Sequence, residues 1–154
     1  MSGTGRNVVI LGSTGSIGRS ALSVIEHDGG TRLRAYGLAA HSSVDALLDQ
    51  ALAFRPRFVA LTCPDAASRI DGRLRGTGVE LLSGRDGVVR MVQDESTDTV
   101  LSAIVGAAGL EGTWAAIEAG KTVALANKET LVVAGPLIMD LDARRAGPGA
   151  RQSS

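Results

Sequence analysis

The sequence runs Asn7-Val-Val-Ile-Leu-Gly-Ser-Thr-Gly-Ser-Ile-Gly18 close to its N-terminus. Residues 7–11 form a short, mostly β-branched apolar run, which is typical of a parallel strand that is buried on both faces. Gly12 ends this run, and an apolar stripe of helical spacing begins at Ile17. The order of strand, glycine-rich turn and helix predicts the first unit of a sheet in which strands and helices alternate.

The same alternation continues along the chain. Further strands are expected at residues 33–39, 58–62, 79–82, 99–105 and 122–126. Helices are expected after each strand, and the last of them would contain Leu137, Ile138 and Leu141. Gly29 and Gly30 are expected to end the first helix. The pattern predicts an α/β fold with a Rossmann-like, doubly wound, mainly parallel sheet and helices on both of its faces.

A chain of 154 residues has the usual size of one domain. We expect residues 1–145 to form that domain and residues 146–154 to be an irregular tail. From Gly147 the tail contains almost no apolar residues. It is either a frayed terminus or the end of a truncated or frameshifted chain whose continuation has been lost.

Composition excludes several function classes. The chain has 16 basic and 16 acidic residues, which gives no electrostatic reason to expect nucleic acid or a membrane surface as a partner. The N-terminus lacks a signal-peptide pattern, and no apolar run reaches the ~20 residues of a membrane helix. A single cysteine, Cys63, excludes an internal disulfide and favours a cytoplasmic location. No group of His, Cys and carboxylate residues has metal-ligand spacing.

The glycines of the first turn have separate physical roles in a dinucleotide-binding unit. Gly12 would permit the tight turn, Gly15 would let the backbone approach a pyrophosphate, and Gly18 would let the helix pack against the strand. The N-terminus of that helix would offer free N–H groups to the phosphates. We therefore expect cofactor binding here, with a purely structural tight turn as the alternative. A P-loop is excluded because no Gly-Lys-Ser/Thr follows.

The end of the second expected strand favours NADP over NAD. A domain that prefers NAD carries a carboxylate there for the ribose hydroxyls. This chain has His41, Ser42 and Ser43 instead, and its first carboxylate is Asp45. The serine hydroxyls and the imidazole can donate hydrogen bonds to a 2′-phosphate. The alternative role for either serine is to cap the following helix.

Two further junctions lie at the carboxyl end of expected strands, where ligands of open α/β sheets bind. Asn127, Lys128 and Glu129 bring together an amide, a cation and a carboxylate; the alternative is a capping Asn127 followed by a solvated ion pair. Residues 104–109 are small enough for a nicotinamide to approach the backbone, or form only a compact turn. Trp114 has the spacing of a core residue on its helix.

Three segments together resemble the 1-deoxy-D-xylulose 5-phosphate reductoisomerase family: residues 8–18, 103–110 and 120–132. The likeness extends from about residue 7 to residue 145. It implies the N-terminal NADPH-binding domain of an oxidoreductase of non-mevalonate isoprenoid biosynthesis. Members of the family rearrange 1-deoxy-D-xylulose 5-phosphate and reduce the product with NADPH to 2-C-methyl-D-erythritol 4-phosphate.

The resemblance also implies roles for particular residues. Lys128 matches the lysine that binds the phosphosugar substrate. His41, Ser42 and Ser43 match the loop for the 2′-phosphate by their position. The other expected contacts with NADPH are made by Thr14, Gly15, Ser16, Ile17, Asn127 and Glu129.

The chain departs from the family in length. Full-length members are more than twice as long, and their Asp-Ser-Glu-His stretch, which binds Mg or Mn, follows the matched region. We therefore expect this chain to contain no catalytic residue and no metal ligand, and to bind NADPH without turnover. Full-length relatives are expected to be homodimers.

Two other functions remain open at this point. One is a non-catalytic NADP-binding module, or a remnant of an enzyme. The other is a different small oxidoreductase, such as a semialdehyde dehydrogenase-like protein, which the lack of a catalytic cysteine or base after the sheet disfavours.

Overall fold

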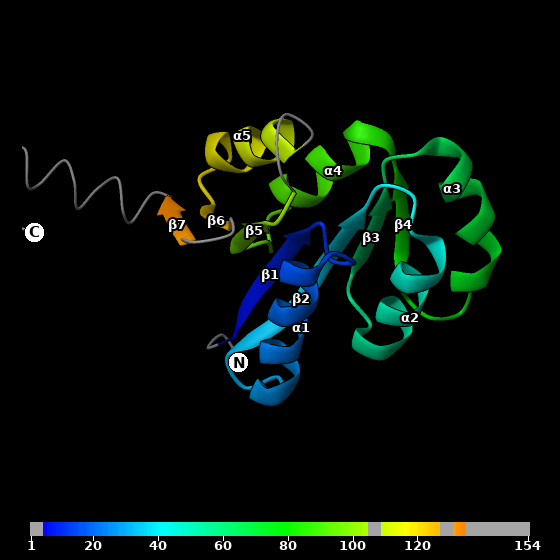
Figure 1. The fold of residues 1–154 in the computed structure, drawn as a ribbon, viewed down its shortest axis with the longest axis horizontal. Coiled ribbons are helices and arrows are strands. Elements are labelled where there is room, and N and C mark those ends of the chain that lie inside the picture. The colour runs from blue at the N-terminus through cyan, green and yellow to red at the C-terminus, as the bar shows by residue number, and fades with distance from the viewer. Residues whose placement is uncertain (1–4, 105–108, 127–130, 135–154) are drawn as a thin grey trace, which may run out of the picture.

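The computed structural model describes residues 5–104, 109–126 and 131–134. They form one seven-stranded sheet with helices on both faces (Figure 1). The strands are β1 (Arg6–Leu11), β2 (Leu33–Ala40), β3 (Phe58–Leu61), β4 (Glu80–Ser83), β5 (Thr99–Ser102), β6 (Thr122–Ala126) and β7 (Leu131–Ala134). The helices are α1 (Ser16–Asp28), α2 (Val44–Phe54), α3 (Pro64–Ile70), the 3₁₀ helix η1 (Asp71–Leu74), α4 (Gly84–Gln93) and α5 (Leu110–Glu118).

The strand order is β4-β3-β2-β1-β5-β6-β7. The first six strands in the sequence pair in parallel, and β7 is antiparallel to β6. The sheet grows from β1 in both directions, because β2 lies on one side of it and β5 on the other. Ligands of doubly wound sheets bind outside the carboxyl ends of the strands at such a reversal.

Each face of the sheet has its own apolar core. One core joins the strands to α1, α2 and α3, and the other joins them to α4 and α5. Val8 and Ile10 of β1 face the first core, whereas Val9 and Leu11 face the second, as the two-residue repeat of a strand requires. The prediction of a first strand that is buried on both faces is therefore confirmed.

The structure confirms the six expected strands and corrects their ends. The fifth strand stops at Ser102 rather than at residue 105. The prediction that residues 122–126 form the last strand is wrong, because β7 pairs with β6 from Val123↔Ala134 to Ala126↔Leu131. The expected last helix, with Leu137, and the tail at 146–154 lie outside the described residues. Among the helices that are described, none is long and apolar enough to cross a membrane.

The core position expected for Trp114 is also wrong, since this side chain is 60% exposed and Leu110 is 64% exposed. Helix α5 instead packs through Gly112 and its small neighbours. A Cβ atom at Gly112 would lie 2.9 Å from Cδ1 of Leu11, so the helix approaches the sheet too closely for a large side chain. The large apolar residues are therefore left on the outer face.

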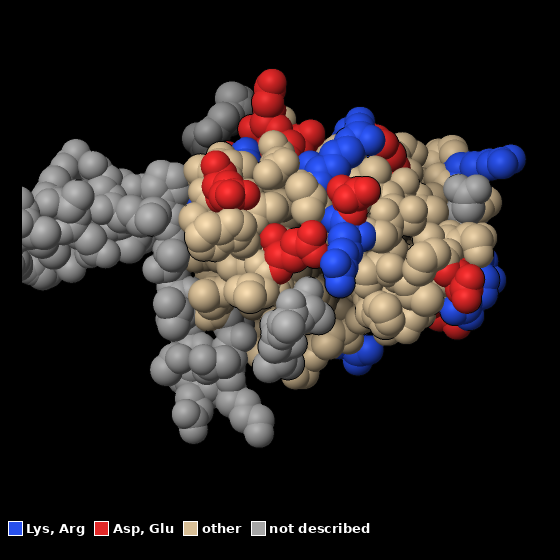
Figure 2. All heavy atoms as spheres, turned by 90° about the horizontal axis from the view of Figure 1, so that it is seen from above, with Lys and Arg blue, Asp and Glu red and all other residues tan. Residues whose placement is uncertain are grey.

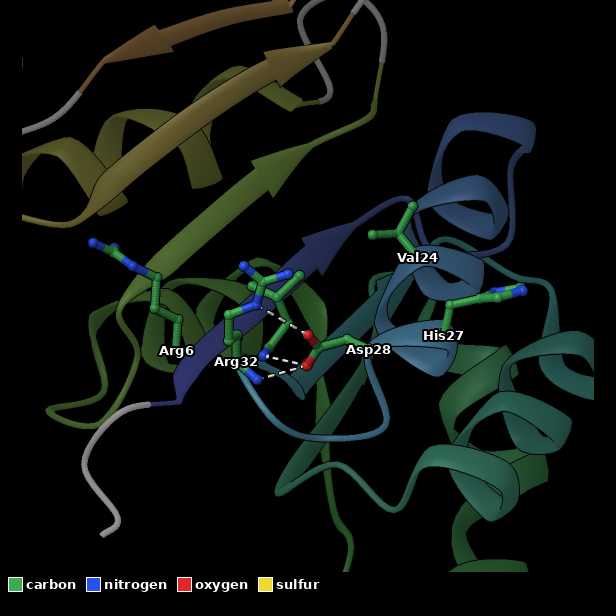
Figure 3. Close-up of a pocket in the computed structure, with 6 residues that line it drawn as sticks. Arg6, Val24, His27, Asp28 and Arg32 are labelled. Carbon is green, nitrogen blue, oxygen red and sulfur yellow. Dashed lines mark hydrogen bonds and ion pairs between the residues drawn. The ribbon is translucent and has the colours of Figure 1, made fainter.

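Asp28 fixes the turn between α1 and β2 at the amino end of the sheet (Figure 3). Its carboxylate accepts hydrogen bonds from the backbone N–H groups of Arg32, at 2.6 Å, and Leu33, at 2.9 Å. The guanidinium of Arg32 lies 3.5 Å from the same carboxylate. The two backbone hydrogen bonds are the main reason that the pKa of Asp28 is lowered, and Arg32 adds to the effect.

Replacing Asp28 with Asn is expected to make folding stability depend less on acid pH. A carboxylate whose pKa is lower in the folded chain stabilises the fold above its unfolded pKa and loses that effect as the pH falls through the folded value. The variant should be less stable than wild type at pH 7, and the difference should shrink below about pH 4. Urea unfolding at pH 7 and at a pH below about 4 measures the difference in the free energy of unfolding. Asp49→Asn, on the exposed side of α2, is the control. A difference that is the same at both pH values would contradict the expectation.

Candidate functional site

A cavity of about 490 Å³ lies at the carboxyl ends of β1 and β2. The strand ends, from Leu11 and Gly12 to Ala39 and Ala40, line its base. Residues 41–43 and the first turns of α4 and α5 also line it. The cavity thus brings together two segments that are separate in the sequence: the glycine-rich turn (residues 12–18) and the loop of residues 41–43, which we call the serine loop.

The glycine-rich turn is held tightly against β2 and α1. Gly12 has φ of +87°, and the N–H groups of Gly12 and Ser13 both donate to the carbonyl oxygen of Ala39, at 2.8 and 3.0 Å. A Cβ atom at Gly18 would lie 2.3 Å from the carbonyl oxygen of Gly12. These contacts confirm the predicted structural roles of Gly12 in the turn and Gly18 in the packing of the helix.

The N-terminus of α1 is uncapped. Gly15 occupies the cap position with no side-chain hydrogen bond, and the first turn contains no acidic residue. The N–H of Arg19 donates to the carbonyl oxygen of Gly15, at 2.9 Å, so the N–H groups of the residues between them have no acceptor within the helix. This end of the helix carries partial positive charge and adjoins Thr14, which lines the cavity. The arrangement suits an anion.

Gln50 of α2 holds the turn from a third element. The hydroxyl of Ser13 donates to Oε1 of Gln50 at 2.8 Å, and Nε2 of Gln50 donates to the carbonyl oxygen of Ser13 at 2.9 Å. Ser13 is completely buried. Gln50 could not be identified from the sequence, since it is 37 positions from Ser13 and no local pattern connects the two residues.

The loop of residues 41–43 follows β2 and leads into α2. Ser43 occupies the cap position of α2, but its side chain makes no capping hydrogen bond. The capping alternative is therefore not found for this hydroxyl. The side chains of Ser42 and Ser43 line the cavity, and the ring Nδ1 of His41 lies 2.7 Å from the hydroxyl of Thr62. Asp45, the first carboxylate after the strand, lies 3.5 Å from Arg73.

Not every expected site residue can be placed. Thr14 lines the cavity, and Gly15, Ser16 and Ile17 continue the same turn into α1. Asn127, Lys128 and Glu129 lie outside the described residues, as does most of the junction at 104–109. Within the described part of the chain, no group of three or more His, Cys, Asp or Glu residues could hold a metal ion.

A second cavity, of about 570 Å³, lies at the opposite, amino end of the sheet (Figure 3). It is lined by basic groups that include Arg6, His27 and Arg32. The carboxylate of Asp28 there already accepts hydrogen bonds from the backbone N–H groups of Arg32 and Leu33. Since open α/β sheets bind ligands at the carboxyl ends of their strands, the first cavity is the candidate site.

Comparison with known sequences identifies the family of the chain. Residues 8–135 match the family model of 1-deoxy-D-xylulose 5-phosphate reductoisomerase. The chain is 47% identical over 141 residues to the reductoisomerase of Dechloromonas aromatica, with 90% of this chain and 35% of the relative covered. The enzyme of Symbiobacterium thermophilum is also 47% identical, over 86% of this chain and 35% of its own length. The chain therefore spans about a third of the length of these curated relatives.

Solved structures of the same kind share the fold. A crystal structure of DOX-P reductoisomerase with NADPH, fosmidomycin and magnesium has a TM-score of 0.74 and 42% sequence identity, and covers 80% of this chain and 30% of that one. The 1-deoxy-D-xylulose 5-phosphate reductoisomerase from Zymomonas mobilis in complex with NADPH has a TM-score of 0.74 and 39% identity, over 81% of this chain and 32% of its own. The Rossmann-like fold class predicted from the sequence is confirmed.

Gly18→Ala is expected to destabilise the chain by about 1–3 kcal/mol, the usual cost of overpacking, because the new methyl group would meet backbone atoms that cannot rotate away. Urea unfolding measures the change in the free energy of unfolding. Gly15→Ala is the matched control, since its Cβ atom would lie 3.7 Å from the nearest contact, the carbonyl oxygen of Gly12. Equal stability of the Gly18 variant and the wild type would contradict the close approach.

Proposed function

Because this chain belongs to the 1-deoxy-D-xylulose 5-phosphate reductoisomerase family, we propose that it is the NADPH-binding part of such an enzyme. The observation that carries the proposal is the single cavity shared by the glycine-rich turn and the serine loop. A dinucleotide needs both: an open helix N-terminus for its pyrophosphate, and an acid-free strand end for its 2′-phosphate.

In this proposal, the backbone of Thr14, Gly15, Ser16 and Ile17 binds the pyrophosphate. Gly15 gives independent support. Its φ of −80° suits any residue, and a Cβ atom would make only an ordinary contact with Gly12. No described protein atom therefore requires a glycine at this position, whereas a phosphate lying against the backbone would.

The loop formed by His41, Ser42 and Ser43 binds the 2′-phosphate in the same proposal. The hydroxyl of Ser43 makes no capping hydrogen bond to α2, and no carboxylate follows β2 directly. Thr62 orients the imidazole of His41 through their 2.7 Å contact. These groups donate hydrogen bonds and add no negative charge, so they favour a phosphorylated ribose over a free one.

The remaining roles rest on the resemblance to the family. Asn127 and Glu129 would contact NADPH, and Lys128 would bind the phosphosugar. When bound, NADPH supplies the hydride that reduces the rearranged 1-deoxy-D-xylulose 5-phosphate. The described residues hold no group that fits the Mg or Mn ion of the family, so no step through a metal is assigned to them.

The organisation of the protein is part of the same proposal. Residues 1–145 form the cofactor domain and residues 146–154 a tail, and the rest of the catalytic machinery corresponds to the part of the relatives that this chain does not cover. A cytoplasmic location and a homodimeric assembly of the full-length enzyme complete it. The alternative is an NADP-binding module or remnant without activity of its own.

Calorimetric titration tests the proposal directly. We expect the folded chain to bind NADPH in the micromolar range and NADH much more weakly, because the cavity has donors for a 2′-phosphate and lacks the carboxylate that a free ribose prefers. Circular dichroism establishes that the titrated chain is folded. If a folded chain binds neither nucleotide, the proposal is wrong.

Gly15→Ala is expected to separate binding from folding. The variant should unfold at the same urea concentration as the wild type and bind NADPH about tenfold more weakly or worse, a loss of about 1.4 kcal/mol. Gly72→Ala is the control, since the Cβ atom of that exposed residue would meet nothing within 4 Å. Unchanged NADPH affinity in the Gly15 variant would show that the phosphates lie elsewhere.

A further inference from the structure

The start of α4 forms part of the wall of the cavity. Strand β4 ends at Ser83, and α4 begins at once with Gly84, whose φ is +71°. Arg85 follows and lines the same cavity as Ser42 and Ser43. Its side chain is 81% exposed, so neighbouring side chains do not confine it. The start of α4 therefore presents a cation to the cavity.

The turn of α4 that follows Arg85 adds an apolar surface to the cavity. Val88 and Val89 also line the cavity, three and four residues after Arg85, and side chains at this spacing lie together on one face of a helix. A purine needs such a surface, because its ring faces are apolar. The adenosine of a dinucleotide lies over the end of the second strand, with its ribose beside the last residues of that strand.

We infer that Arg85 is a specificity-determining residue that binds the 2′-phosphate of NADPH in the cavity that it shares with Ser42 and Ser43. This inference rests on the proposed function and deepens it. Among the described residues that line the cavity, Arg85 is the only lysine or arginine. A planar guanidinium binds phosphate oxygens through two parallel hydrogen bonds, which a hydroxyl cannot do.

Glu111 competes with the phosphate for Arg85. It lies at the start of α5 and is the only carboxylate among the described lining residues. Its Oε1 is 3.5 Å from Nε of Arg85, and more than half of each side chain is exposed. An exposed pair of this kind contributes little to stability, so a phosphate can replace the carboxylate at small cost.

The other arginines near the serine loop are less suited to this role. Arg69 and Arg73 line a separate hollow of about 410 Å³ that also touches Ser42 and Ser43. That hollow includes no residue of the glycine-rich turn, and it contains the exposed carboxylate of Asp45. A ligand whose pyrophosphate lies at Thr14 occupies the cavity that contains Arg85 instead.

The test compares NADPH and NADH binding by calorimetry in the wild type and in Arg85→Ala, Arg85→Lys and Glu111→Gln. Arg85→Ala should weaken NADPH binding about tenfold or more and leave NADH binding unchanged. Lys should restore part of the loss, since it keeps the charge but not the paired hydrogen bonds. Glu111→Gln should tighten NADPH binding a few-fold. Arg90→Ala is the matched control, because Arg90 lies on the same helix, pairs with Glu80 at 3.2 Å and does not line the cavity.

Four results would overturn the inference. Equal losses of NADPH and NADH affinity in Arg85→Ala would show that the side chain covers the adenine rather than reads the phosphate. Loss of NADPH affinity in Arg69→Ala but not in Arg85→Ala would assign the phosphate to the other hollow. If the folded wild type binds no NADPH, the proposed function fails and the inference fails with it. If the wild type binds NADPH and the Arg85 variants bind it equally tightly, the inference alone fails.

Discussion

The contact between Gly18 and the carbonyl group of Gly12 constrains the rest of the site. A side chain at Gly18 would lie within 2.3 Å of that oxygen, so α1 must begin directly against the turn that ends β1. Strand β1 cannot shift to relieve the contact, because it is buried on both faces. The turn is also tied to β2 through the carbonyl oxygen of Ala39 and to α2 through Gln50. The open N-terminus of α1 is therefore fixed at the carboxyl end of the sheet.

The second constraint is the path of the chain after the edge strand. Helices α1, α2 and α3 cover one face, and after β4 the chain crosses to the other face as α4 and then returns to the centre as β5. The start of α4 consequently reaches the same cavity as the loop after β2. Topology alone brings Arg85 and Ser42 together, since they are more than forty positions apart in the sequence.

The features that could be predicted from the sequence are those whose cause is local. The apolar run at residues 7–11, the glycine spacing and the alternation of elements each act over one strand or turn, and the structure confirms them. Gln50 depends on how α2 packs against the turn, and Trp114 on how closely α5 approaches Leu11. A four-residue run such as Leu131–Ala134 carries no helical or strand period of its own, so only its pairing with β6 identifies it as a strand.

Net charge gives no basis for the proposed preference for NADPH, because the basic and acidic residues are equal in number and lie interspersed on the face seen in Figure 2. Selectivity must then arise from single groups within the cavity. A 2′-phosphate brings up to two negative charges. While the guanidinium of Arg85 stays beside the carboxylate of Glu111, the pair has no net charge. Arg85 attracts the phosphate only when its guanidinium turns away from that carboxylate. In the proposed function, the preference for NADPH therefore rests on the donors of the serine loop and on Arg85, whose exposed ion pair with Glu111 is weak.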